Sequence, residues 1–263
     1  MAILCVAVPW RAAAQGGPPY YTNDPGTPGN RSWEINVAYM PFLFNGSSTI
    51  HVPDLDINYG VGDRIQLTYE NAWLRVKDDG SAAKYGLGQD QLGVKWRFVG
   101  SENTSLEISV FPQVSLNNLN HSVQRGITPL GKSITLPVEI SKRLGPLDFN
   151  LEVGYNIVDR GPNSWLTGLV VGRDLTRRME WDVEFYGVQT DDHSNDQRTI
   201  GSGLRYKMRP PFVLLMMAGR SVTAAHNGQP FFVGYIGMQI LLPVKPFESS
   251  RRHRKTTPVD IDD

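Results

Sequence analysis

One stretch of the 263-residue chain has the spacing of a phosphate-binding loop. Gly126 to Ser133 has the sequence GITPLGKS, which fits the pattern in which backbone amides and a lysine hold nucleotide phosphates. The pattern requires a helix directly after it, because the helix N-terminus takes part in binding the phosphate. Here Ile134 to Ile140 follows, a segment that alternates like a strand and contains a proline. We interpret the match as a chance feature of a glycine-rich loop.

Histidine and serine are adjacent in two polar stretches, at His121-Ser122 and His193-Ser194. These residue types would suit a hydrolase, in which a histidine base activates a serine at hydrogen-bond distance. Adjacent residues of a strand face opposite ways, however, and no His-x-Ser pair occurs in a strand-like segment. We therefore predict polar loops and no enzyme activity. The acid pairs that could bind calcium are also expected to be solvated, so we predict no cofactor and no metal site; these pairs are Asp78-Asp79 and Asp191-Asp192.

Charged residues at alternate positions of strand-like segments are the stronger candidates for function. They would all point to one side of a sheet, where acids and bases on neighbouring strands pair across the ladder. Two hypotheses follow: these residues line a selective conduit, or they brace and plug the interior of a barrel. The candidates are Asp54, Asp56, Glu70, Lys95, Arg97, Glu180, Asp182, Glu184, Arg205 and Lys207.

The hairpin from Asp54 to Glu70 shows how such faces are built. Apolar and polar residues alternate on both sides of a Gly62-Asp63 turn, which is typical of two antiparallel strands. One face carries only aliphatic and aromatic groups, namely Leu55, Ile57, Tyr59, Ile65, Leu67 and Tyr69. The opposite face carries acids, amides and a threonine. The alternation alone does not say which face is the inside.

About twelve segments show this alternation, each close to the ten residues that a tilted strand needs to cross a bilayer. Short connections follow the even segments, and mostly long, polar loops follow the odd ones. The short connections include Gly62-Asp63, Gly145-Pro146 and Pro210-Pro211. An even strand count with short turns at one rim predicts an all-β fold, an antiparallel up-and-down transmembrane β-barrel of about 12 strands.

A membrane barrel directs its apolar face to lipid and its polar face to a wet lumen, whereas a soluble barrel does the opposite. Aromatic residues near the strand ends favour the membrane barrel, because aromatic girdles mark the two membrane interfaces. These residues are Trp33, Tyr39, Tyr69, Trp96, Trp165, Trp181 and Tyr206. A soluble periplasmic barrel that binds an apolar ligand remains an alternative.

The ends of the chain differ in composition from the barrel. Residues 1–14 resemble a secretory signal peptide, and the alternative is an apolar tail that stays on the protein. The only cysteine, Cys5, falls in this segment. We expect an extended lead-in over 15–30, the barrel over 31–243 and a disordered basic tail over 244–263. Twenty-six basic residues balance 26 acidic ones, so we predict no nucleic-acid partner.

Several stretches of the first hundred residues are similar to a family of Gram-negative outer-membrane β-barrels. The likeness rests on Gly17 to Pro25, Trp33 to Asn36, Pro53 to Leu67 and Tyr85 to Phe98. This family is grouped with the meta-pathway of phenol degradation and catalogued among transporters. The resemblance implies an outer-membrane location, contact with outer-membrane lipid and passage of small, hydrophobic or aromatic molecules. A plugged, structural barrel remains the alternative, and the oligomeric state stays open.

Overall fold

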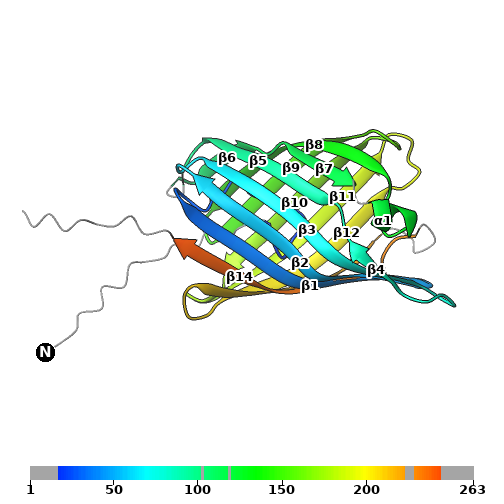
Figure 1. Ribbon diagram of the computed structural model, residues 1–263. Helices are drawn as coiled ribbons and strands as arrows, with labels where there is room; N and C mark the ends of the chain where they lie inside the picture. The colour runs from blue at the N-terminus through cyan, green and yellow to red at the C-terminus, as the bar shows by residue number, and fades with distance from the viewer. Residues whose placement is uncertain (1–16, 102–103, 118–119, 223–227, 244–263) are drawn as a thin grey trace, which may run out of the picture.

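The computed structural model describes residues 17–101, 104–117, 120–222 and 228–243, which form a closed barrel of antiparallel strands (Figure 1). The first half of the barrel contains β1 (Ser32–Phe44), β2 (Ser47–Val61), β3 (Ile65–Asp78), β4 (Lys84–Leu87), β5 (Asp90–Val99), β6 (Leu106–Val110) and β7 (Gln113–Asn117). The second half contains β8 (Gly131–Leu144), β9 (Leu147–Val158), β10 (Ser164–Asp174), β11 (Met179–Thr190), β12 (Gln197–Lys207), β13 (Phe212–Ser221) and β14 (Phe232–Pro243). A short helix, α1 (Asn120–Gln124), lies between β7 and β8.

Two of the barrel strands are interrupted, so the fourteen segments occupy twelve strand positions. The end of β3 pairs with β4, and its beginning pairs with β5. Likewise, β6 and β7 both pair with β5 on one side and with β8 on the other. The barrel closes where β1 pairs with β14, from Ser32 opposite Pro243 to Leu43 opposite Phe232. The predicted fold class, an antiparallel barrel of about 12 strands, is confirmed.

The connections divide into two groups at opposite ends of the barrel. We call the "turn end" the rim with residues 62–64, 100–101, 104–105, 145–146, 175–178 and 208–211. The "loop end" carries residues 79–83, 120–130, 159–163, 191–196, 222 and 228–231, together with the two-residue connection between β1 and β2. The first connection is therefore an exception to the pattern of long loops after odd strands. No helix among the described residues is long and apolar enough to span a bilayer.

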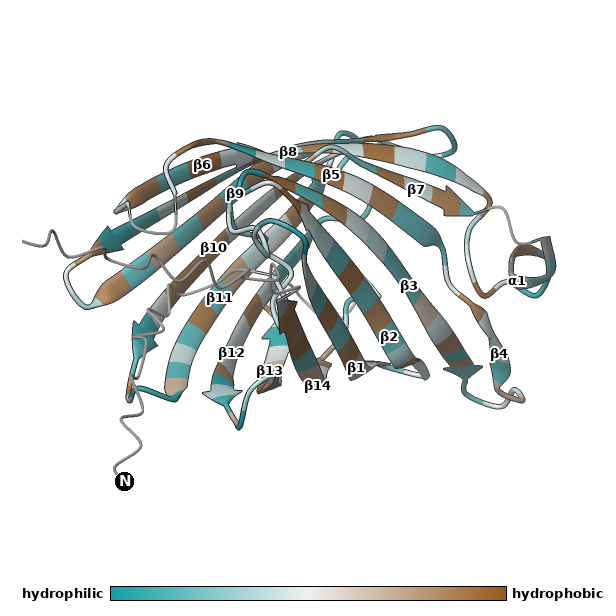
Figure 2. Ribbon diagram, turned by 60° about the vertical axis from the view of Figure 1, so that its left-hand side comes forward, coloured by the Kyte–Doolittle hydropathy of each residue, from teal (hydrophilic) through white to brown (hydrophobic). Residues whose placement is uncertain are grey.

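The apolar face of the strands lies outside. In the β2–β3 hairpin, Leu67 and Tyr69 are exposed, whereas Asn58, Gln66 and Thr68 are buried. Figure 2 shows the same alternation of polar and apolar bands along strand after strand. The seven aromatic residues expected near the interfaces, Trp33, Tyr39, Tyr69, Trp96, Trp165, Trp181 and Tyr206, are all exposed. The described residues thus form a barrel that is apolar outside, the inverse of a soluble barrel.

The interior is mostly polar, but the described residues form two apolar clusters, a small one of Ala72, Leu74 and Ile127 and a larger apolar patch. Ala38, Val213, Leu215, Val233 and Tyr235 pack on the inner side of β1, β13 and β14. Tyr20 from the N-terminal part of the chain belongs to the same cluster. The apolar patch therefore contacts a segment that lies within the barrel.

The loop with the phosphate-binding spacing is followed by a strand. Gly131, Lys132 and Ser133 begin β8, which pairs with β9 through Leu144. Since the helix that such a site needs is replaced by this strand, the sequence match has no nucleotide-binding geometry. The expected signal peptide (1–14) and basic tail (244–263) lie outside the described residues.

Candidate functional site

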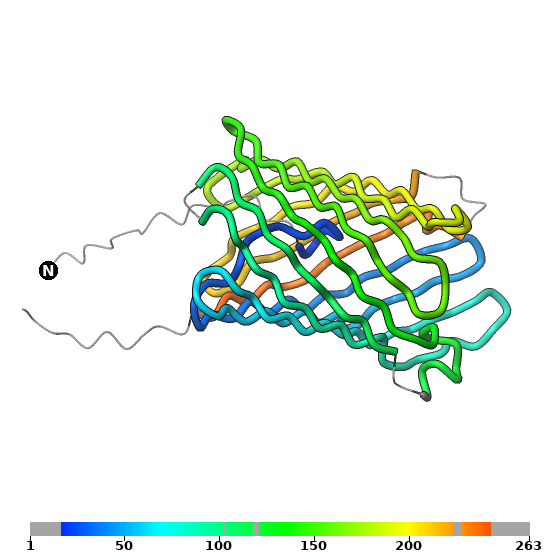
Figure 3. The backbone as a smooth tube through the Cα atoms, turned by 90° about the horizontal axis from the view of Figure 1, so that it is seen from above, coloured from blue at the N-terminus to red at the C-terminus, as the bar shows by residue number. Residues whose placement is uncertain are grey.

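The chain enters its own barrel before the first strand begins. Residues 17–30, which we call the "N-terminal segment", run inside the barrel from the turn end, as the dark blue tube in Figure 3 shows. A tight turn between Gly17 and Thr22 is held by backbone hydrogen bonds of 2.6 and 2.9 Å. Thr22 is completely buried. The described part of the lead-in expected over 15–30 thus enters the lumen, whereas Asn30 at its end is exposed at the turn end.

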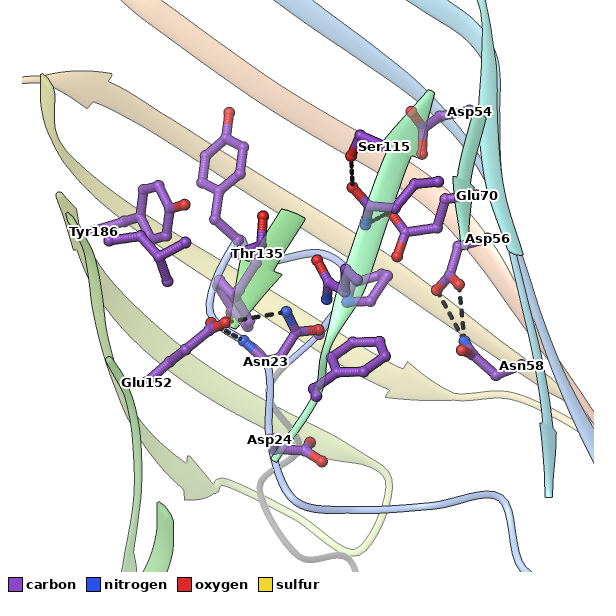
Figure 4. A pocket seen from close by; sticks show the side chains of 18 of the residues that line it. Asn23, Asp24, Asp54, Asp56, Asn58, Glu70, Ser115, Thr135, Glu152 and Tyr186 are labelled. Atoms are coloured by element: carbon purple, nitrogen blue, oxygen red, sulfur yellow. Dashed lines mark hydrogen bonds between the residues drawn. The ribbon is translucent and has the colours of Figure 1, made fainter. Parts of the chain in front are cut away.

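Two buried carboxylates hold the middle of the N-terminal segment. Glu184 Oε1 on β11 accepts hydrogen bonds from Thr22 N at 2.7 Å and from Thr22 Oγ1 at 2.8 Å. Glu152 on β9 accepts from Asn23 N at 2.7 Å and from Asn23 Nδ2 at 3.4 Å (Figure 4). Charge-assisted bonds of this kind are stronger than bonds between neutral groups. The strand carboxylates therefore act as anchors for backbone that lacks a secondary-structure partner.

A second group of charges holds the first residues of the N-terminal segment. Tyr20 Oη donates to Asp182 Oδ2 at 3.2 Å, and Arg205 Nη2 donates to the Gly17 carbonyl at 3.1 Å. The Arg205 guanidinium lies 5.8 Å from the centre of the Tyr20 ring. Burial and the neighbouring Asp182 raise the pKa of the Tyr20 phenol, so it keeps its proton and acts as a donor. Glu180 is buried next to this group, opposite Arg205 in the register of β11 and β12.

Lys95 on β5 reaches the N-terminal segment from the opposite wall. Its Nζ donates to the Asp24 backbone carbonyl and lies 3.4 Å from Glu139 Oε2 on β8. It also sits 4.7 Å from the centre of the Phe111 ring. Ser109 Oγ donates to the same Glu139 carboxylate at 2.5 Å. Lys95 thus ties the backbone of the N-terminal segment to β5 and, through Glu139, to β8.

Arg97 has a different role although it is only two residues from Lys95. Its Nη1 pairs with Glu107 at 2.8 Å, and its Nη2 donates to the Asp63 carbonyl at 2.6 Å. Arg97 therefore braces the turn end. Lys207 also lies at this end, half-buried at the last position of β12.

A cavity of about 430 Å³ lies in the lumen beside the N-terminal segment. Figure 4 shows Asp54, Asp56 and Glu70 on one wall, with Glu152 and Tyr186 across from them. Four of the ten predicted residues line this cavity: Asp54, Asp56, Glu70 and Lys95. Asp182, Glu184 and Arg205 contact the N-terminal segment instead, whereas Arg97, Glu180 and Lys207 lie closer to the turn end.

The occupant of the lumen was not predicted from the sequence, nor were its anchor Glu152 and the partner of Lys95, Glu139. Glycines in the strands were the one sequence feature that could have indicated a segment inside the barrel. A side chain at Gly168 would overlap Thr22, and one at Gly60 would overlap the Gly29 carbonyl. These glycines leave room for the N-terminal segment. Within the described ranges, no cluster of three His, Cys, Asp or Glu residues could hold a metal ion.

Comparison with known proteins supports the architecture. No protein-family profile and no curated protein sequence matches the chain. Among solved structures, the chain resembles an outer membrane channel from Pseudomonas putida F1, with a TM-score of 0.66 and 13% identity over 83% of this chain and 98% of that one. It also resembles the NanC porin (TM-score 0.53, 10% identity, 81% and 100%) and the KdgM porin (TM-score 0.52, 12% identity, 79% and 98%). At this level of identity the likeness concerns the fold, which is that of outer-membrane channels.

Proposed function

We propose that the protein is a narrow outer-membrane channel for small molecules. The observation that carries this proposal is a closed barrel with an apolar outer face and a polar interior that contains a cavity of about 430 Å³. Strands that are apolar outside and polar inside suit a barrel that spans a bilayer and encloses water. The likeness to outer-membrane channels supports the same function. Outer-membrane barrels have short turns on the periplasmic side, so the turn end of this barrel is proposed to face the periplasm.

The N-terminal segment sets the width of the proposed channel. It occupies the lumen between β5, β9 and β11 and is held by charged groups on these strands. The cavity beside it is the path that remains for a solute. The channel is therefore expected to conduct weakly and to pass only small solutes.

We propose that the charged interior residues serve both roles considered from the sequence, lining a conduit and bracing the barrel, at different depths. Asp54, Asp56, Glu70 and Lys95 are proposed to line the conduit. Asp182, Glu184 and Arg205 are proposed to position the N-terminal segment, and Arg97, Glu180 and Lys207 to brace the turn end. We also propose that the chain belongs to the family grouped with the meta-pathway of phenol degradation, and that residues 1–14 direct its export.

Planar-bilayer recording with the purified full-length protein tests the proposal. We expect small single-channel currents for the parent protein and larger ones for a variant that lacks residues 17–27. Both proteins should shift in heat-modifiable gel migration, which verifies that the barrel has formed.

A plugged structural barrel is the competing hypothesis, favoured by the many hydrogen bonds of the N-terminal segment. It predicts no current from the parent protein at any voltage that the bilayer withstands. A silent parent protein with a conducting deletion variant would therefore replace the channel by a plugged barrel.

A further inference from the structure

The lumen cavity has an acidic wall with little basic charge to balance it. Among the described residues that line the cavity, six carry carboxyl groups, whereas Lys95 is the only lysine or arginine. We define the "acidic wall" as Glu34 on β1, Asp54 and Asp56 on β2, and Glu70 on β3. Its members are neighbours in the sheet, since Asp56 lies opposite Glu70 and opposite Asn36 in the register.

Neutral groups solvate the acidic wall. Asp56 accepts hydrogen bonds from Asn36 and Asn58, and Glu70 accepts one from Gln91. Among the residues the structure describes, no lysine or arginine forms an ion pair with any of the four acids. The nearest basic group is His51, whose Nδ1 lies 2.8 Å from Asp54 Oδ2. Carboxylates this close together repel one another, and a bound cation would relieve the repulsion.

Aromatic rings form another part of the same cavity. Tyr21 of the N-terminal segment stacks on Tyr186 of β11, with ring centres 5.1 Å apart. Phe42 and Tyr235 also line the cavity. Aromatic faces attract ammonium and guanidinium groups and also pack against an apolar body. The lining therefore combines carboxylates with rings, which suits an organic cation better than a bare metal ion.

Three buried polar side chains in the lining have no hydrogen-bond partner among the residues that the structure describes. Gln113, Ser164 and Tyr235 are each less than 9% exposed and line the cavity. None of the three side chains forms a hydrogen bond with another described residue. Buried polar groups are normally hydrogen-bonded, so these groups point to a solute or to water as their partner. They are a second observation, independent of the acidic wall, that indicates a ligand.

We propose that this cavity is a binding site for small organic cations, with an ammonium or guanidinium group at the acidic wall and an apolar body against Tyr21 and Tyr186. The proposal rests on the proposed function, because the cavity is part of the proposed conduit. It narrows the solute class from small molecules in general to amines that carry an apolar or aromatic group. A solute with a carboxylate in place of the amine would meet repulsion from the acidic wall.

Calorimetric titration of the detergent-solubilised full chain tests the ligand class. The probe is phenethylammonium chloride, and sodium phenylacetate is the anion with a similar body. We expect saturable binding of the cation and at least about tenfold weaker binding of the anion, because the acidic wall repels a carboxylate. A tenfold ratio corresponds to a difference of about 1.4 kcal/mol in binding free energy. Equal binding of the two probes would overturn the proposal. Displacement by potassium chloride at the same concentration as the amine would reduce the site to an inorganic cation site, which also overturns it.

Variants of the lining test the residues. The double substitution Asp54→Asn with Glu70→Gln removes two charges and should weaken binding of phenethylammonium by roughly tenfold or more. Asp79→Asn, which removes an exposed acid at the loop end, should leave binding unchanged. Tyr186→Leu should weaken binding by about two- to fivefold, whereas Tyr186→Phe should keep it, because only the ring is needed. Unchanged affinity in the double variant and in Tyr186→Leu would contradict the proposal.

The result of the binding experiment can be distinguished from the result of the channel recordings. Binding is measured in detergent and needs no current, and heat-modifiable migration verifies that each variant is folded. A channel that conducts but binds neither probe keeps the proposed function and refutes the cation site. A protein that binds the amine but carries no current refutes the channel and keeps the site.

Discussion

The substitution Glu184→Gln tests how firmly the barrel holds its N-terminal segment. The change removes one negative charge and keeps the size of the side chain. Glu184 is only 1% exposed, and its Oε1 accepts two hydrogen bonds from Thr22, at 2.7 and 2.8 Å. A hydrogen bond to a charged group contributes about 1.5–3 kcal/mol and a neutral one about 0.5–1.5 kcal/mol. Loss of the charge therefore weakens the docking of the segment by about 2–3 kcal/mol for the two bonds.

This energy corresponds to a measurable change in the current. Because about 1.4 kcal/mol changes an equilibrium tenfold, the ratio of undocked to docked segment should rise roughly 30- to 150-fold. Single-channel recordings of the variant should show a second, larger current level that is rare in the parent protein. The variant that lacks residues 17–27 gives the size of the fully open level.

The matched control is Asp148→Asn. Asp148 is also a buried carboxylate, but it pairs with Arg143 at the turn end, 2.7 Å away, and has no hydrogen bond to the N-terminal segment. The control should have the current levels of the parent protein. If Glu184→Gln and the control have the same occupancy of the larger level, Glu184 does not hold the segment and the reasoning fails.

Three further substitutions probe other parts of the structure. Gly168→Ala adds a methyl group that overlaps Thr22, so larger currents are expected, and parent-like currents would show that the wall adapts. Val94→Arg places a charge on the outer face and should lower the free energy of unfolding in lipid vesicles by about 2–4 kcal/mol, against about 0–1 kcal/mol for Val61→Arg beside the turn end. Equal costs at the two positions would contradict the membrane orientation. Lys95→Gln removes the only lysine or arginine among the described residues that line the cavity, so the reversal potential in a potassium chloride gradient should move toward cation selectivity; no movement would exclude Lys95 from the conduit.

The strand pattern was available from the sequence because it is local. In the β2–β3 hairpin, side chains alternate with period two on both sides of Gly62, whose φ of +64° is suited to glycine. The same periodicity over twelve segments, with short turns at one rim, was sufficient to predict the barrel. The sequence did not predict the breaks between β4 and β5 and between β6 and β7, because short interruptions hardly change the alternation.

The facing of the strands needed more than alternation. A period of two separates the residues into two faces but does not say which face contacts lipid and which contacts the lumen. The aromatic residues near strand ends favoured lipid outside, and the exposed Trp96 and Trp165 agree with this expectation. The sequence likewise predicted that the candidate charged residues lie together on the inner face, because residues at alternate positions of a strand share a face.

The roles of these charges were decided only by the tertiary structure. Lys95 and Arg97 share a strand and a face, yet Lys95 contacts the N-terminal segment and Arg97 contacts the Asp63 turn. The sequence of residues 17–30, rich in glycine, proline and small polar groups, has the composition of an exposed loop. Its partners Glu152 and Glu184 lie 129 and 162 positions away along the chain. The sequence by itself determined the barrel and its polar interior, whereas closure of the barrel decided what fills it, because only closure brings those carboxylates to the segment.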